Sequence, residues 1–372
     1  MTTIGTDEIK TIRQIVADFA KREIRPAALE SDRYPFAAFN HPLMQKLAEN
    51  GFLRPTLTEE ASGAGMRMLG AVLEEIARED ASIALIILIQ SIAAQLRMES
   101  GETTGIRQGF VESTGGGETL VALPVYADPV ERPDSVKAAT QGNGFILNGS
   151  VSYIPCLPVA DEVIIPVVMQ NGKGIRLFRV LCKAAGVTIG DPIVSLGLRA
   201  CPIADLTLHH VSMPADAVIG NNDGIKHYEG LCERFRGPLT AIALGILKGA
   251  CAAARRYAEE RYQGKKQIID HDMVRMMLSN MIAWIDMGTV AVNEACRLAD
   301  EKEPCPPSAL LSIQTLASTA VTRATADGVQ VLGGYGYMHE YGQEKRMRDA
   351  KQLQAVFGSV PVKRLEILKR NP

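Results

Sequence analysis

The stretch "QVLGGYGYMHEYGQEKRMRDAKQLQAVFGSVPVKR", residues 330–364, decides how the chain is interpreted. Its "LGGYGY" segment looks at first like a dinucleotide fingerprint, in which glycines let the backbone approach a phosphate. Such a fingerprint follows a strand and opens a helix. Here the glycines follow a helical pattern and their spacing is different, which argues against a Rossmann fold. By itself the segment predicts a glycine-rich loop between two helices.

Outward from this stretch, the spacing of apolar residues divides the chain into three parts. In residues 6–113 the apolar residues recur every three or four positions, which is typical of helices. Short β-rich runs separated by Gly, Asn, Asp and Pro follow, and from about residue 230 long amphipathic helical patterns return. We therefore predict an α+β multidomain fold. It has an N-terminal all-α domain (residues 1–118), a middle β-barrel domain (residues 119–224) and a C-terminal four-helix bundle (residues 225–372).

Composition limits the classes of partner. The chain has 372 residues, 47% hydrophobic and 22% charged, which is enough for a sizeable core. The net charge is -2 and the basic residues lie among acidic ones, which argues against nucleic acid and membrane surfaces as partners. The most apolar run, residues 81–94, is too short to cross a bilayer and predicts a core helix.

The cysteines and histidines show no metal-binding pattern. Seven cysteines form no CxxC pair, and the six histidines are scattered. An odd number of cysteines in a chain of this length is typical of free thiols in a reducing compartment. The polar start "MTTIGTDEIKTIRQ" lacks the apolar segment of a secretory signal. These features predict a cytoplasmic protein without a metal site.

Three separated stretches give the chain a family resemblance. They are "ENGFLRPTLTEEASGAGM" (49–66), "AEERYQGKKQIIDHDMVRMMLSNM" (258–281) and "QVLGGYGYMHEYGQEKRMRDAK" (330–351). Together they resemble the acyl-CoA dehydrogenase superfamily, and the resemblance covers essentially the whole chain. It implies an FAD cofactor, an acyl thioester carried by CoA or by a carrier protein, and assembly as a homotetramer or as a heteromer with a homologous subunit.

The resemblance also implies which residues hold the adenosine-diphosphate end of FAD. The family's arginine that reaches the pyrophosphate of a neighbouring subunit's FAD corresponds to Arg261, with Gln263 two residues on. A guanidinium group suits this role because it forms charge-assisted bonds to phosphate. Family residues further along correspond to Gln330, Gly333 and Gly334, and a missing side chain at the glycines lets backbone approach a ligand closely.

Other family positions lie near the flavin ring and the thioester. Tyr153 and Ser359 correspond to residues at the flavin ring, and Ser359 keeps the hydroxyl group. The family's helix arginine near the thioester corresponds to Arg236. An alternative for Arg236 is a purely structural ion pair with Glu233 or Glu229. Arg348 and Asp349, the "RD" of "RDAK", are also open to interpretation as structural salt-bridge residues.

The catalytic base of the family is the main departure. Relatives remove the α-proton of the thioester with a glutamate, and the position of this residue corresponds to Phe357. Some relatives carry the base on a bundle helix instead, and that position corresponds to Phe235. Neither phenylalanine accepts a proton, so we expect both rings to line the substrate site or pack in the core, stacked on each other. Tyr153 and Glu233 are weak candidates for a replacement acid or base.

The β-module departs from the family as well. A family stretch that contacts flavin and thioester is replaced by "ALPVYADPVERPDS" (122–135), and the family's "W-I-T-N" becomes "YIPC" (153–156). Pro155 removes a backbone donor, and Pro361 stands where relatives have Gln. The adenosine-diphosphate end of the flavin site is therefore better preserved than the end that holds the isoalloxazine.

Three functions remain open from the sequence. The first is a flavoenzyme that acts on an acyl thioester by an atypical oxidation or elimination. The second is a non-catalytic subunit of a heteromeric acyl-CoA dehydrogenase, which supplies Arg261, Gln330 and the glycines to its partner's FAD. The third is a flavin-dependent monooxygenase or oxidase on the same fold, in which no glutamate base is needed.

Overall fold

The protein is described by a computed structural model that covers residues 6–53, 65–99, 119–126, 136–170, 174–220, 224–301, 306 and 308–371. Its N-terminal part is helical, as predicted. The bounds are α1 (Thr6–Phe19), the π-helical turn η1 (Ala20–Ile24), α2 (Arg25–Ala28), η2 (Glu30–Asp32), α3 (His41–Glu49), α4 (Gly65–Glu79) and α5 (Ala81–Glu99).

Helix α5 joins the N-terminal helices to the sheet. Its apolar residues between 81 and 94 are buried, as predicted. Gln90 is buried as well, and its side-chain amide pairs with the backbone of Val121: Nε2 donates to the carbonyl and Oε1 accepts from the N–H, both at 3.0 Å. A buried amide needs both partners, so this polar residue fixes the helix against β1.

The middle part is a sheet domain. Eight strands are paired in the order β6-β7-β3-β2-β4-β5-β8, and β1 pairs with β4. Strand β3 is the longest, and its pairing with β7 shifts register between Val151 and Ile154, where Tyr153 has a positive φ. The bounds are β1 (Val121–Ala122), β2 (Val136–Gln141), β3 (Gly144–Pro155), β4 (Glu162–Met169), β5 (Ile175–Leu181), β6 (Val187–Ile189), β7 (Ile203–Met213) and β8 (Val218–Ile219), with short 3-10 turns η4 (Leu157–Val159) and η5 (Ala215–Ala217).

The C-terminal part is a helix bundle built on α8. Helix α4 packs closely on α8 at two glycines, because a Cβ at Gly245 would lie 2.2 Å from the Glu74 carbonyl oxygen and one at Gly249 would lie 2.4 Å from that of Arg78. The predicted "GGYGY" loop is the 3-10 turn η7. The bounds are α7 (Gly224–Arg234), α8 (Arg236–Glu260), β9 (Tyr262–Gln263), β10 (Lys266–Gln267), η6 (Ile268–Asp270), α9 (Asp272–Glu301), α10 (Ala309–Leu332), η7 (Gly333–Tyr337), η8 (His339–Tyr341), α11 (Gln343–Leu353) and α12 (Val360–Lys369).

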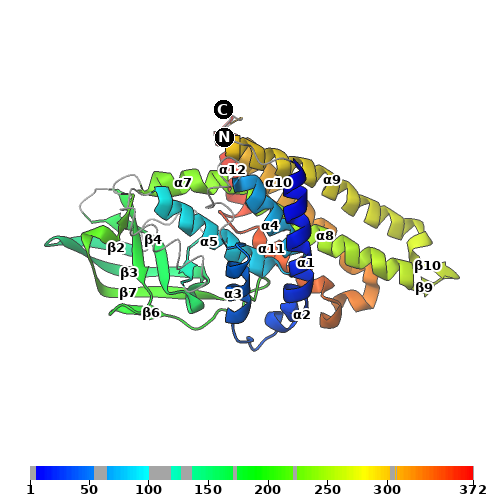
Figure 1. Ribbon diagram of the computed structural model, residues 1–372, viewed down its shortest axis with the longest axis horizontal. Helices are drawn as coiled ribbons and strands as arrows, with labels where there is room; N and C mark the ends of the chain where they lie inside the picture. Colours follow the sequence, from blue (N-terminus) through cyan, green and yellow to red (C-terminus); the bar gives the residue numbers. More distant parts are fainter. Residues whose placement is uncertain are drawn as a thin grey trace.

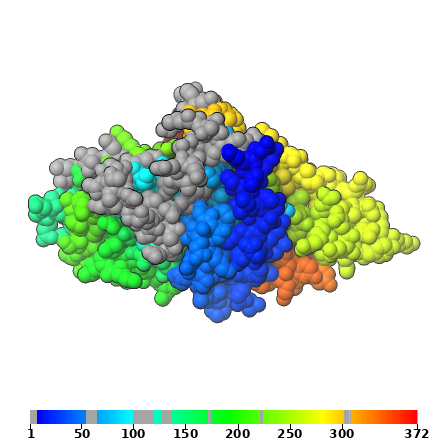
Figure 2. Space-filling view, viewed as in Figure 1, coloured from blue at the N-terminus to red at the C-terminus, as the bar shows by residue number. Residues whose placement is uncertain are grey.

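The predicted order of helices, sheet and helices is therefore confirmed. The sheet lies at one end of the molecule, the β9–β10 hairpin lies at the other, and α1 to α4 lie between them (Figure 1). Figure 2 shows the blue N-terminal helices between the green sheet domain and the yellow end of the bundle. The segments Ala81–Met98 and Gly224–Glu260 are apolar and long enough to cross a membrane, but most of their residues are buried inside the protein. The domain boundaries at 118/119 and 224/225 stay predictions.

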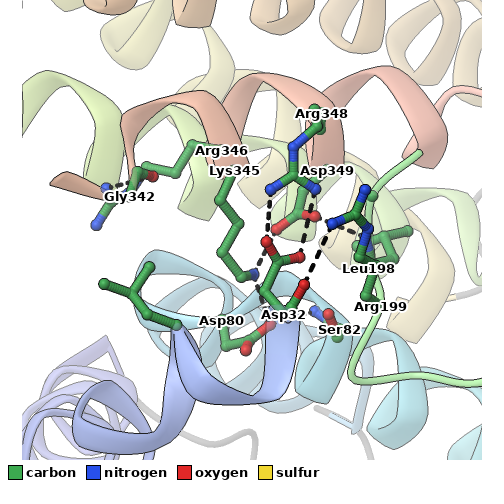
Figure 3. A network of polar contacts seen from close by, with 12 residues as sticks. Asp32, Asp80, Ser82, Leu198, Arg199, Gly342, Lys345, Arg346, Arg348 and Asp349 are labelled. Atoms are coloured by element: carbon green, nitrogen blue, oxygen red, sulfur yellow. Dashed lines mark hydrogen bonds and ion pairs between the residues drawn. The ribbon is translucent and has the colours of Figure 1, made fainter. Parts of the chain in front are cut away.

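A buried ionic network joins the three parts (Figure 3). Nζ of Lys345 on α11 lies 3.2 Å from a carboxylate oxygen of Asp80, between α4 and α5, and 2.7 Å from one of Asp349. The other Asp349 oxygen accepts a 2.6 Å bond from the N–H of Leu198 in the sheet domain. Arg348 pairs with Asp32 and Glu344. Arg348 and Asp349 are thus structural ion-pair residues, one of the two interpretations that the sequence left open.

The network holds Lys345 charged. Burial by itself favours the neutral amine, but the carboxylates of Asp349 and Asp80 outweigh it and raise the pKa of Lys345 above its ordinary value. Burial raises the pKa of Asp80, and the Lys345 ammonium opposes this effect. Each charge is therefore tolerated in the interior because of its partners.

We expect Lys345→Met to lower the free energy of unfolding by about 3–5 kcal/mol, because it leaves two buried carboxylates without their cation. Urea unfolding measures this change. The matched control is Lys351→Met, an exposed lysine on the same helix, which should change stability by less than about 0.5 kcal/mol. Equal effects of the two substitutions would show that the network contributes nothing specific.

Candidate functional site

Five sequence-predicted residues line one pocket at the β9–β10 end of the bundle. This pocket has a volume of about 660 Å³. We call it the diphosphate pocket. It contains Arg261, Gln263, Gln330, Gly333 and Gly334. The sequence places them in two groups about seventy residues apart, and the fold brings them together.

The diphosphate pocket fits an anionic dinucleotide end. Arg261 is exposed at the C-cap of α8, and its guanidinium has no hydrogen-bond or ion-pair partner in the part of the chain that the structure describes. Gly333 ends α10 with a φ of 58°, and a Cβ at Gly333 or Gly334 would meet open space. A diphosphate can therefore reach both a free guanidinium and bare backbone, which is the donor set expected for this group.

A second pocket lies between the sheet domain and the α11–α12 junction, with a volume of about 590 Å³. We call it the ring pocket. Tyr153 and Ser359, both predicted at a flavin ring, line it. So do residues that the sequence analysis missed, which are Tyr126, Ser152, Ile193, Val194, Ser195, Leu196, Ile203, Lys351, Gln352, Ala355 and Gly358. Apolar walls with hydroxyl and amide groups suit a flat heteroaromatic ring with a polar rim.

Contacts across the domain boundary shape the ring pocket. Gln352 of α11 accepts a 2.8 Å bond from the N–H of Gly197 and donates a 3.1 Å bond to the hydroxyl of Tyr126. Gly197 has no room for a side chain, since its Cβ would lie 2.5 Å from the Arg348 carbonyl carbon. Burial raises the pKa of the Tyr126 phenol, so this group stays neutral. Sheet and bundle therefore meet at a fixed distance, which sets the width of the pocket.

Tyr153 reaches the ring pocket from an irregular point of β3. Its φ is 60°, its side chain is 54% exposed, and its N–H donates a 2.8 Å bond to a carboxylate oxygen of Asp205. A tyrosine with a left-handed backbone conformation is unusual, and the hydrogen bond to Asp205 stabilises it here. The bulge places the phenol at the pocket wall, where it can donate a hydrogen bond to a ligand.

Phe357 lies in the turn between α11 and α12 and also has a positive φ, of 58°. Its N–H donates a 2.7 Å bond to the Val125 carbonyl oxygen, and its ring is 7% exposed, in the hydrophobic core. Gly358 and Ser359 line the ring pocket, but Phe357 itself does not. The hydrogen bond to Val125 and the packing of the ring hold the turn in this left-handed conformation. Strained backbone held by its surroundings is typical of functional sites.

The other predicted substrate residues lie behind this turn. Arg236 donates to Glu233 at 2.8 Å and also pairs with Gln314, so the ion-pair alternative is what the structure shows. Phe235 is fully buried at the start of α8. The aromatic pairs of the described residues do not include Phe235 with Phe357, so the expected stacking is wrong.

Glu233 is poorly suited to be a base. Burial raises its pKa, but hydrogen bonds from Arg236 and Arg370, the latter at 3.0 Å, outweigh burial and lower the pKa below its ordinary value. A carboxylate held by two guanidinium groups binds a proton weakly. Glu233 therefore acts here as a structural anion.

Lys363 is a residue of this region that the sequence analysis missed. Its side chain is 2% exposed, and Nζ donates to the carbonyl oxygens of Val356 at 2.7 Å and Gln354 at 3.0 Å. Burial lowers its pKa to about 7, and nearby Arg236 adds to the effect. Gln314 donates to the same Val356 carbonyl at 3.1 Å. Lys363 thus supports the turn that carries Phe357.

The buried Lys363 predicts a pH dependence of stability. Between pH 7 and the ordinary lysine pKa near 10.4 the unfolded chain binds more protons than the folded protein, so the free energy of unfolding rises with pH by up to about 1.4 kcal/mol per unit. We expect Lys363→Met to remove this rise, and urea unfolding across the window measures it. Lys369→Met, an exposed lysine on the same helix, should retain it. A pH-independent difference between wild type and Lys363→Met would contradict the lowered pKa.

Comparisons with known proteins identify the family of the chain and agree with its fold. Residues 6–104 match the acyl-CoA dehydrogenase N-terminal domain and residues 222–371 match the C-terminal domain. Cyclohex-1-ene-1-carbonyl-CoA dehydrogenase of Geobacter metallireducens is 30% identical over 371 residues, 97% of each chain. The 3-(aryl)acrylate reductase of Clostridium sporogenes is 28% identical, over 97% of this chain and 98% of its own. The structure of butyryl-CoA dehydrogenase from Megasphaera elsdenii superposes with a TM-score of 0.89 at 25% identity, over 99% of both chains.

The fold is one of two helical regions around a sheet domain, with the ring pocket and the diphosphate pocket as two separate cavities. The chain belongs to the acyl-CoA dehydrogenase family. The replaced family stretch at 122–135 lies mostly outside the described residues, since 127–135 are not among them.

Proposed function

We propose that this protein is an FAD-dependent oxidoreductase that acts on an acyl thioester without a carboxylate base at the usual position. One observation carries the proposal. The ring pocket contains no Asp or Glu among its described lining residues, and the turn at the family's base position carries a buried Phe357. An α-proton therefore has no carboxylate to accept it, which favours an atypical oxidation or elimination.

The residues have distinct roles in this proposal. Bound FAD supplies the hydride-transfer chemistry. Arg261 and Gln330 hold its diphosphate end, while the hydroxyls of Tyr153 and Ser359 donate to the rim of the ring. Phe357 closes the turn against water. The name of one relative, cyclohex-1-ene-1-carbonyl-CoA dehydrogenase, supports an acyl thioester of CoA as substrate, and an acyl group on a carrier protein is the alternative.

A second candidate is a non-catalytic subunit of a heteromer. It is favoured by the contrast between the two pockets. The diphosphate pocket contains all five expected residues, whereas the ring pocket lacks a base.

A third candidate, a flavin monooxygenase or oxidase, needs no base, and it is distinguished by oxygen consumption. In all three the chain works without nucleic acid or membrane, and we propose a cytoplasmic location.

The visible spectrum of the purified protein, before and after addition of FAD and gel filtration, separates the first two candidates. We expect a flavin band with one FAD per chain, because the ring pocket has the size and the lining that an isoalloxazine requires. Anaerobic bleaching by an acyl thioester would then identify the substrate. A colourless protein that does not retain FAD would overturn the proposal and favour the partner subunit.

We expect Phe357→Glu to create α,β-dehydrogenation of an acyl-CoA, because it restores a proton acceptor in a desolvated turn whose burial raises the carboxyl pKa toward neutrality. Anaerobic bleaching of the bound flavin measures the reaction. The matched control is Phe357→Gln, because glutamine has nearly the same shape as glutamate but cannot accept the proton. Equal behaviour of the two FAD-loaded variants would show that the missing base is not what sets the reaction.

We further infer that each FAD is shared by two chains. Helix α8 carries Arg261 at its end, and its start lies near the ring-pocket turn, because Arg236 pairs with Gln314, which bonds Val356. The 25 residues of α8 span roughly 38 Å. This exceeds the reach of an extended FAD, so the two pockets of one chain cannot hold the same molecule. A homotetramer, or a heteromer with a homologous subunit, satisfies this requirement.

A hybrid experiment tests the sharing. Arg261→Met damages the diphosphate pocket, and Ala355→Trp fills the ring pocket. Neither variant alone should retain FAD. Two differently tagged variants purified as a mixed pair should regain one intact site per pair, because a two-fold interface joins the ring pocket of one chain to the diphosphate pocket of the other. No flavin in the mixed pair would contradict sharing.

A further inference from the structure

A third cavity lies where the N-terminal helices meet the bundle. It has a volume of about 230 Å³, is lined by residues of α2, α4, α8 and α11, and shares no lining residue with the ring or diphosphate pocket. We call it the arginine cavity, because Arg25, Arg78, Arg256 and Arg346 line it together with Lys345. This number of cations around so small a space is unusual for a structural void.

Two of these cations are neutralised within the fold. Arg25 donates two 2.7 Å bonds to both oxygens of Glu79. Lys345 is paired with Asp80 and Asp349. The lining carboxylates, Glu79 and Asp349, are therefore both committed to neighbours.

Three cations remain without a carboxylate. Arg78, Arg256 and Arg346 form no ion pair with any Asp or Glu in the described ranges of the chain. Arg346 uses one nitrogen to donate a 3.1 Å bond to the Gly342 carbonyl oxygen, and its Nε lies over Gly249 of α8. Its other N–H groups have no acceptor among the described residues. The cavity thus has an excess of positive charge and unused donors.

Arg346 lies among charges of both signs. Burial lowers the pKa of its guanidinium, Glu79 and Asp349 oppose this effect, and Arg25 and Arg256 add to it. The 11-residue helix α11 begins at Gln343, directly after the lining residue Gly342, so the positive end of its dipole also faces this region. The four arginines and Lys345 outnumber the two lining carboxylates, Glu79 and Asp349, and a bound anion would relieve this excess of positive charge.

We propose that the arginine cavity binds a small tetrahedral oxyanion, either inorganic phosphate or the phosphate group of a small phosphomonoester. Planar guanidinium groups bind phosphate oxygens in pairs, and a helix N-terminus adds backbone donors. The cavity is smaller than the roughly 300 Å³ at which pockets for drug-sized ligands begin, so it suits a compact anion rather than a dinucleotide. The anion would connect Arg78 of the N-terminal domain to Arg256 and Arg346 of the bundle.

The test is isothermal titration calorimetry of the full-length, FAD-loaded protein at low ionic strength, with inorganic phosphate in one series and methyl phosphate in another. We expect saturable binding of one anion per chain. Binding of phosphate alone would assign the cavity to the free anion, and binding of both would assign it to a phosphomonoester head group. Binding of neither would overturn the proposal.

Variants assign the binding to this cavity. Arg346→Met and Arg256→Met should each weaken phosphate binding about tenfold or more, because each removes a charge-assisted hydrogen bond. Arg256 is exposed, so its variant remains informative even if Arg346→Met is unstable. The matched control is Arg255→Met, which removes the neighbouring arginine that pairs with Glu259, and it should bind normally.

A second control excludes the diphosphate pocket as the source of the signal. Saturation with FAD should leave the titration of added phosphate unchanged, since the diphosphate pocket shares no lining residue with the arginine cavity. Loss of the phosphate signal on FAD loading, together with normal binding by Arg346→Met and Arg256→Met, would overturn the proposal. Because the readout is anion binding and not turnover, its outcome is independent of the reaction that the ring pocket performs.

Discussion

The buried ammonium of Lys345 is the interaction on which the arrangement of the three domains depends. It stands between Asp80 of the N-terminal helices and Asp349 of its own helix, and Asp349 in turn holds the backbone of Leu198 in the sheet domain. A buried ion group of this kind adds little net stability, but it is costly to break and therefore specifies one arrangement. It orients α11, whose C-terminal end forms one wall of the ring pocket.

A second buried lysine shows how environment decides charge in this region. Lys345 has carboxylates beside it and a raised pKa, whereas Lys363 has only carbonyl oxygens and the cation Arg236 nearby, and its pKa falls to about 7. Lys363 can therefore hold the Val356 carbonyl without a full charge in the core. The turn it supports keeps Phe357 left-handed, which costs about 1–2 kcal/mol for a residue with a Cβ. The contacts of the turn therefore hold an apolar residue in a strained backbone conformation.

The five residues that the sequence analysis grouped at one end of the cofactor line a single pocket, whereas most residues of the ring pocket were missed, and the reason is physical. Arg261 and Gln263 lie at the end of α8, and Gln330 and the glycines lie at the end of α10. Local patterns therefore locate both groups. The ring pocket is built by long-range contacts, such as Gln352 with Gly197, which no local pattern encodes. Lys363 in "VPVKR" looks like an ordinary surface lysine, because its burial is a tertiary property. The expected stacking of Phe235 on Phe357 failed for the same reason, since sequence spacing does not give side-chain direction across a bundle.

The replacement at Phe357 agrees with the charges around it. Behind the turn, Arg236 is already neutralised by Glu233, and burial and Arg236 lower the Lys363 pKa, with no carboxylate contributing to the shift. A glutamate at position 357 would place a negative charge one residue from the carbonyl that Lys363 holds, and the protonated lysine would then be favoured. With phenylalanine the apolar ring and the weakly basic amine are mutually compatible. The charges around the turn therefore do not require a carboxylate at position 357, which is compatible with the reaction proposed above.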